Sequence, residues 1–224
     1  MDNLSGMKAV LDIIDYFDPP KRSRSMNNAE ALKELIYMLK ANTHWRAYRP
    51  TCGVTWHCLY KRFHKWVKLG ILREIKSSLL RSYSKKKLKR TPKWFKTIFI
   101  DSTLVKSMYG VECVGRNPVD RAKPGIKVSI ICDENMVPIS ISYYPANTPD
   151  TKTILESFDA IECDIRNDDR YTIDLIGDKG YIAEPENEVL RSVRVNLKTP
   201  NRKNAVKPKY LGERSLGQLK RRHK

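Results

Sequence analysis

The sequence contains no apolar run that approaches the roughly 20 residues of a membrane-spanning helix, and it does not open with a secretory signal. Its five cysteines are odd in number and irregularly spaced. Such cysteines do not make the disulfide framework of a small secreted domain. These absences predict an intracellular protein in a reducing compartment.

A short chelating pair of cysteines is also missing. Cys52 and Cys58 lie near His57 and His64, and all four are residue types that bind zinc. Five residues separate the two cysteines, whereas about two to four separate the usual pair. The spacing therefore does not favour a zinc site.

Acidic residues are scarce at both ends of the chain. Residues 1–96 carry 22 Lys and Arg against 7 Asp and Glu, and residues 200–224 carry 9 against 1. Residues 97–199 carry 12 against 17, and the whole chain has a formal net charge of +18. Two basic flanks around an acidic middle predict a protein that binds a nucleic acid on either side of a site that collects cations. A basic protein with solvated charged faces is the alternative, and charge alone leaves it open.

The chain is long enough for two small domains. Its 224 residues can bury a core, and hydrophobic residues make up 41% of them, which excludes a disordered polyelectrolyte. Helical patterns fill the first part, over residues 7–17, 29–41, 55–69 and 71–83. A basic segment that ends near Pro92 follows them. The sequence therefore predicts a helical domain over residues 1–83, a basic linker over 84–95 and a second domain over 96–224.

The helix expected over residues 55–69 is basic on its free surface. Leu59, Phe63 and Trp66 recur at helical spacing, which indicates a buried face. Four basic side chains lie elsewhere around this helix: Lys61, Arg62, Lys65 and Lys68. With a preceding helix joined by a short turn, the pattern fits a helix-turn-helix that binds DNA by placing its second helix in a groove. An ordinary amphipathic helix with solubilising lysines fits equally well, and both interpretations remain open.

The middle of the chain alternates strand and helix patterns. Strand patterns cover residues 94–103, 125–133, 137–144, 171–176 and 193–197, and helix patterns cover 148–161 and 184–192. This order predicts an α+β or α/β domain with a mixed sheet covered by helices. Asp101 closes the first strand pattern, and Asp178 follows the strand at 171–176. A strand end exposes a side chain on a fixed backbone, so these two aspartates are candidate catalytic residues.

A third candidate carboxylate lies in the basic tail. Glu213 is the only acidic residue among residues 200–224. It shares a helical face with Leu216 and Lys220. A lone acid in a basic segment is commonly a solvated ion-pair partner, but Leu216 indicates that this face is turned towards the core.

Three acidic motifs thus stand in a fixed order along the chain. They are Asp101 at a strand end, Asp178 in Gly-Asp-Lys-Gly-Tyr, and Glu213 in Glu-x-x-Leu-x-x-Leu-Lys, at separations of 77 and 35 residues. In order and spacing they resemble the DDE triad of bacterial-type insertion-sequence transposases. The resemblance extends to the N-terminal helices. It implies an RNase H-like catalytic domain that follows a small, all-helical, helix-turn-helix-like DNA-binding domain.

The resemblance implies that Asp101, Asp178 and Glu213 are both the catalytic residues and the metal ligands. Converging carboxylates repel one another unless divalent cations neutralise them, and all-oxygen ligation favours Mg²⁺ or Mn²⁺. Two such ions, bridged by Asp101, would serve cleavage of the DNA strand at the element ends, which leaves a 3′-hydroxyl. Attack of that hydroxyl on target DNA would complete the strand transfer. Transposition joins two ends, so a homodimer on DNA is expected.

Further residues are expected to support this chemistry. Lys179, Lys209 and Lys220 would bind phosphates without reading bases. Ser102 and Tyr181 would orient or pack against the site, without a catalytic role.

Two departures from the family pattern concern the end of the chain. Lys209 and Val206 stand where relatives often carry an arginine and a tyrosine, and only 11 residues follow Glu213. The expectation is a chain truncated at its C-terminus. The alternative function is therefore an inactive, transposase-derived DNA-binding protein. A basic RNA- or chromatin-associated protein is a third interpretation, which the acidic middle disfavours.

Overall fold

The computed structural model describes residues 3–21, 25–90, 95–107, 110, 112–163 and 172–200. The chain divides into two compact units, Met1–Arg81 and Ser82–Lys224. Within the described ranges, no helix combines the length and the apolar character needed to cross a membrane.

The first unit is helical. Its elements are α1 (Asn3–Phe17), α2 (Asn28–Lys40), the 3-10 helix η1 (Trp45–Ala47), α3 (Trp56–Lys68) and the start of α4 (Ile71–Arg90). A capping box begins α2, because the Asn27 side chain accepts a hydrogen bond from the Glu30 amide and the Glu30 carboxylate accepts one from the Asn27 amide, each at 2.8 Å. Gly70, with φ of +71°, follows α3 and lets the chain turn directly into α4.

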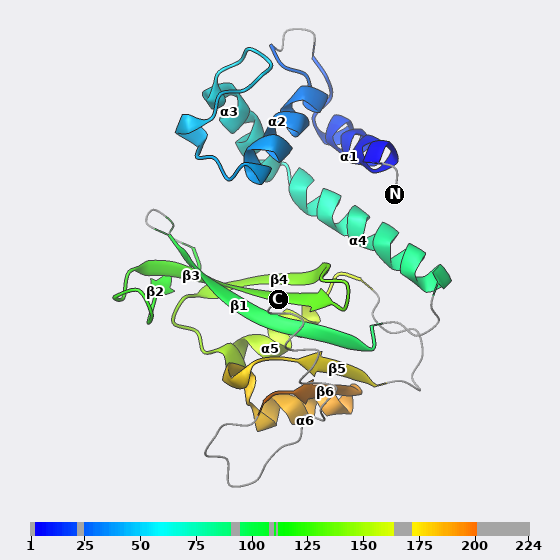
Figure 1. Ribbon diagram of the computed structural model, residues 1–224, viewed down its shortest axis with the longest axis vertical. Coiled ribbons are helices and arrows are strands. Elements are labelled where there is room, and N and C mark those ends of the chain that lie inside the picture. Colours follow the sequence, from blue (N-terminus) through cyan, green and yellow to red (C-terminus); the bar gives the residue numbers. More distant parts are fainter. Residues whose placement is uncertain are drawn as a thin grey trace. The chain divides into compact units, whose positions relative to one another are not determined.

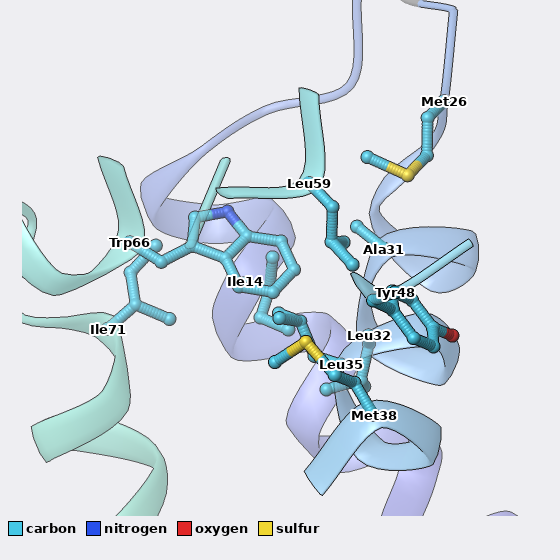
Figure 2. Packing of buried hydrophobic residues seen from close by; sticks show 10 residues of the cluster. All are labelled: Ile14, Met26, Ala31, Leu32, Leu35, Met38, Tyr48, Leu59, Trp66 and Ile71. Carbon is cyan, nitrogen blue, oxygen red and sulfur yellow. The ribbon is translucent and has the colours of Figure 1, made fainter. Parts of the chain in front are cut away.

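The core of the first unit forms where the apolar faces of these helices meet (Figure 2). It comprises Ile14, Met26, Ala31, Leu32, Leu35, Met38, Tyr48, Leu59, Trp66 and Ile71. The buried Asp18 carboxylate accepts hydrogen bonds from the Trp66 indole at 3.1 Å and from the Lys65 ammonium at 2.6 Å. The polar edge of the largest core side chain is thereby satisfied.

Residues 41–55 join α2 to α3, where the sequence predicted only a short turn. This longer segment folds around the buried Glu34 carboxylate. That carboxylate accepts hydrogen bonds from the Thr51 amide at 2.8 Å, the Thr51 hydroxyl at 2.6 Å, the Cys52 amide at 3.1 Å and the Tyr48 hydroxyl. Burial acts to raise the pKa of Glu34, but these hydrogen bonds outweigh it and lower the pKa below its ordinary value.

The second unit is a mixed sheet with flanking helices (Figure 1). Its elements are β1 (Thr97–Lys106), β2 (Gly115–Arg116), β3 (Pro124–Asp133), β4 (Pro138–Pro145), α5 (Asp150–Asp159), β5 (Ile173–Ile176), η2 (Lys179–Tyr181), α6 (Glu184–Ser192) and β6 (Val195–Lys198). The strand order is β2-β3-β1-β5-β6, and β4 also pairs with β3. Strands β1, β3 and β4 are antiparallel, whereas β5 and β6 run parallel to β1. The predicted mixed sheet covered by helices is confirmed.

Helix α4 continues to Arg90, through residues that the sequence predicted as the start of a linker. Tyr83 and Lys87 lie one turn apart, and both donate hydrogen bonds to the Asp133 carboxylate, Lys87 at 2.7 Å. Asp133 is fully buried, which acts to raise its pKa, but the bonds from Lys87, Tyr83 and the Val137 amide lower it overall. This anchorage keeps the basic segment helical. The domain boundaries drawn from the sequence stay predictions.

Strand β1 also extends further than predicted, because it pairs with β3 along its whole length as far as Lys106 opposite Gly125. Asp101 therefore lies within β1 rather than at its end. On the other side, β5 reaches only to Ile176, which pairs with Phe99. Because β5 ends at Ile176, its pairing with β1 stops at Phe99, before Asp101, and the β5 side of the sheet is accessible there.

Candidate active site

The structure brings Asp101 and Asp178 to one place on the sheet. Phe99 of β1 pairs with Ile176 of β5 in parallel register, and each aspartate comes two residues later on its own segment. Asp101 shares the face of Phe99 on β1, because residues two apart on a strand share a face, and Asp178 follows two residues after the end of β5. Both aspartates are exposed. Two carboxylates 77 residues apart in sequence thus stand beside each other at the open end of β5.

A third carboxylate approaches Asp178 from helix α5. The Asp178 side chain accepts a hydrogen bond from the Gly180 amide at 2.8 Å and so begins η2. A Cβ on Gly180 would lie 3.0 Å from Asp178 Oδ1 and 2.8 Å from Asp150 Oδ2. The two carboxylates therefore converge on Gly180, and no side chain fits between them.

Asp150 is held by one ion pair and one hydroxyl. Its Oδ1 accepts hydrogen bonds from the Lys127 ammonium at 2.7 Å and from the Ser102 hydroxyl at 2.8 Å. Lys127 projects from β3, and its side chain is only 9% exposed. The sequence assigned Asp150 to the start of a helix, in a segment that resembles the family, but gave it no role at the site and did not single out Lys127. A lysine on the buried face of an apolar strand needs an acidic partner, and that signal was available.

Tyr181 lies beneath this group of carboxylates. Its side chain is buried, and its hydroxyl has no hydrogen-bond partner among the residues that the structure describes. Burial is the largest cause that raises the pKa of Tyr181, and the Asp150, Asp101 and Asp178 carboxylates raise it further. All three acids thus lie close enough to act electrostatically on one phenol.

The donor atoms suit a hard divalent cation, since Asp101 and Asp178 supply carboxylate oxygens. The third predicted ligand, Glu213, lies outside the described residues, as do Lys209 and Lys220. In the part of the chain that the structure covers, no group of three or more His, Cys, Asp or Glu is placed to hold a metal ion. Lys179 is exposed next to Asp178, where an incoming phosphate could reach it.

The predicted DNA-binding residues of α3 divide into two kinds. They are Lys61, Arg62, Lys65 and Lys68. Arg62 donates to the Asn28 side chain at 2.6 Å, and Lys65 forms the ion pair with Asp18. These two side chains therefore hold the first unit together. Lys61 and Lys68 are exposed on the surface of the helix.

The model of the transposase DDE domain family matches residues 95–224, more than half of the chain. No curated protein sequence matches it. The chain is similar to the cryo-EM structure of the piggyBac transposase synaptic complex with hairpin DNA, at 10% identity and a TM-score of 0.40, over 90% of this chain and 42% of that one. It is also similar to the Mos1 strand transfer complex, at 9% identity and a TM-score of 0.30, over 80% of this chain and 59% of that one. The chain therefore spans about half the length of these transposases.

Proposed function

Since the chain belongs to the transposase DDE domain family, we propose that it cleaves DNA strands at the ends of a mobile element and transfers them into target DNA. In the first step, water would attack a phosphodiester and leave a 3′-hydroxyl and a 5′-phosphate. In the second, that 3′-hydroxyl would attack a target phosphodiester and release a 3′-hydroxyl of the target. Bonds and charges balance in both steps without a redox partner.

The observation that carries this proposal is the juxtaposition of Asp101 and Asp178. The proposal is supported by the pairing of Phe99 with Ile176, since each aspartate comes two residues later on its own segment and both are exposed. Repulsion between two like charges held close together costs electrostatic free energy, and the fold does not need the two charges there for its stability. Such an arrangement is typical of a site that binds cations.

Divalent ions would supply the charge that activates water and stabilises the leaving oxygen when they are bound. We assign Asp101, Asp178 and Glu213 to holding two Mg²⁺ or Mn²⁺ ions. Lys179, Lys209 and Lys220 would bind the phosphates of the DNA and orient the scissile bond. Ser102 and Tyr181 would support the site from below.

The first unit would bind DNA through the exposed face of α3. We assign Lys61 and Lys68 to phosphate contacts, and we assign Arg62 and Lys65 to holding the fold because both are engaged inside the unit. Two element ends must meet during transposition, so the working species would be a homodimer on DNA. Its place would be inside the cell, on the DNA.

Replacement of the two aspartates tests the proposal. With Mg²⁺ and a supercoiled plasmid that carries the gene and its flanking DNA, Asp101→Asn and Asp178→Asn should each slow nicking about a hundredfold or more. DNA binding should stay the same or tighten, because each change removes a negative charge. Asp159→Asn, on an exposed position at the far end of α5, is the matched control and should nick like the wild type. Nicking retained in both site variants would contradict the proposal.

A further inference from the structure

We propose that Asp150 is a positioning residue that ties together the two backbone segments carrying Asp101 and Asp178. The inference rests on the proposed function only for the purpose of the two carboxylates. The role itself is to keep β1 at a fixed distance from the segment that follows β5, and both are described in the structure. Nothing in the sequence motifs marks Asp150 for this role.

Helix α5 is seated firmly enough to act as the support. A buried hydroxyl network joins it to the sheet: the Ser157 hydroxyl donates to the Ser129 hydroxyl of β3 at 2.9 Å. The Ser140 hydroxyl of β4 donates to the Ser157 carbonyl at 2.7 Å, and the Tyr144 hydroxyl lies 3.2 Å from the Ser157 hydroxyl. These groups are buried, so each bond must form for the helix to pack without loss. The first residue of α5, Asp150, therefore has a fixed position.

From this position Asp150 contacts three separate elements. Its Oδ1 accepts hydrogen bonds from Ser102 of β1 and from Lys127 of β3. Its Oδ2 lies against Gly180, whose amide donates to the Asp178 carboxylate. One side chain thus bonds to the residue that follows Asp101 and packs against the residue whose amide holds Asp178.

The support comes from behind the proposed site. Asp101 and Ser102 are consecutive strand residues, so their side chains project from opposite faces of β1. Ser102 pairs opposite Ser129, on the face that α5 covers. Asp101 projects from the other face, with Phe99 and Ile176. Asp150 can therefore fix the backbone of β1 without occupying the face where DNA would bind.

The charge of Asp150 is already compensated, which separates it from the proposed ligands. Lys127 pairs with it at 2.7 Å and is nearly buried itself, so neither charge can be released to solvent without loss. By contrast, Asp101 and Asp178 are exposed. Asp150 is therefore suited to hold the backbone, whereas Asp101 and Asp178 are the carboxylates that a cation from solvent can reach.

Gly180 shows how little room this arrangement leaves. A methyl group there would lie 2.8 Å from Asp150 Oδ2, closer than a carbon and an oxygen can approach. Gly180 needs its small size here for space, because its backbone is not in the left-handed region. A side chain at residue 180 would therefore push Asp150 and Asp178 apart.

Amide hydrogen exchange followed by mass spectrometry tests the tie without any metal or DNA. In Asp150→Ala, the peptides over residues 99–104 and over 176–182 should both exchange about tenfold faster than in the wild type. Asp150→Asn keeps an acceptor oxygen for Ser102 but leaves the Lys127 charge uncompensated, so its exchange should lie between that of Asp150→Ala and that of the wild type. The matched control Asp159→Ala, on the same helix, should change neither peptide.

A double variant guards against simple unfolding. Asp150→Ala leaves the Lys127 charge uncompensated, which can unfold the unit. Lys127→Met with Asp150→Ala removes both charges and should fold, yet it should still show faster exchange in both peptides. Exchange that stays at the wild-type rate in both peptides of this double variant would overturn the proposal, as would acceleration confined to α5.

Manganese binding, measured by electron paramagnetic resonance, separates positioning from a purely structural role. If Asp150 holds the two aspartates at a fixed distance from each other, the double variant should bind Mn²⁺ about tenfold more weakly or worse while the second unit stays folded. Affinity equal to that of the wild type would overturn the positioning role. A wild-type chain that binds no Mn²⁺ would contradict the proposed function, and the exchange of the two peptides would then decide the role of Asp150 alone.

Discussion

At the scale of single residues, buried carboxylates hold segments of this chain together through hydrogen bonds. Glu34 organises the segment between α2 and α3, and Asp133 anchors the end of α4. Each is ionised among donors that fully satisfy it, and each has a lowered pKa. The chain therefore relies on ionised acids for its fold as well as for its proposed chemistry.

Acid should weaken the first unit through Glu34. Its pKa is lower in the folded state than in the unfolded state, so its contribution is complete above the unfolded value of about 4.3 and is lost as pH falls through the folded value. Glu34→Gln should cost about 1–3 kcal/mol at pH 7 and should flatten the loss of stability towards pH 3. Urea unfolding followed by tryptophan fluorescence at both pH values measures this. Glu74→Gln, at an exposed ion pair with Arg81, is the control, and equal pH dependence in Glu34→Gln and wild type would contradict the assignment.

At the scale of elements, the basic residues of helix α3 divide into two that hold the fold and two that are exposed to solvent. Lys61→Ala should leave stability unchanged, weaken DNA binding several-fold and reduce the slope of log affinity against log salt by about 1. Lys65→Ala should instead lower stability by about 1–3 kcal/mol, because it strips a partner from the buried Asp18, with the loss reduced by the half-exposed lysine. Fluorescence anisotropy at two salt concentrations and urea unfolding measure the two effects. If Lys65→Ala weakened DNA binding as much as Lys61→Ala without loss of stability, the division of the faces would be wrong.

Local patterns predicted most of these elements, and the misses have physical causes. The helix at 184–192 was predicted at the bounds that the structure has, because Pro185 and two glutamates mark its first turn and Arg191 its last. The basic segment after residue 83 was predicted as a linker because its composition is highly charged. It is helical as far as Arg90 because Tyr83 and Lys87 reach Asp133, about 50 residues further along the chain. No local pattern contains that contact.

The candidate site shows the same limit. Asp101 and Asp178 could be predicted from the sequence, since each follows an apolar strand pattern and two such strands are natural neighbours. Asp150 could not be placed beside them, because its bonds to Lys127 and Ser102 join residues 23 and 48 positions apart. Only the register of β1 against β3 and the seating of α5 bring these residues together.

At the scale of the whole molecule, the sheet topology explains why distant residues meet. Strands β3 and β4 extend β1 on one side as antiparallel neighbours, and β5 and β6 add on the other side through helical crossovers. The carboxyl ends of parallel strands meet at one edge of a sheet, which is where ligands commonly bind. The acidic middle of the chain thus contributes the sheet and its two exposed aspartates, between two basic flanks suited to DNA.

The central claim is that Asp101 and Asp178 share a bound cation, and iron-directed cleavage of the polypeptide tests it most directly. Iron(II) can replace Mg²⁺ and, with ascorbate and peroxide, generates radicals that cut the backbone close to the bound ion. The account predicts cuts near residue 101 and near residue 178 in the same experiment, both suppressed by excess Mg²⁺ and both lost in Asp178→Asn. Cuts at only one of the two segments, or cuts at both that survive in Asp178→Asn, would contradict it.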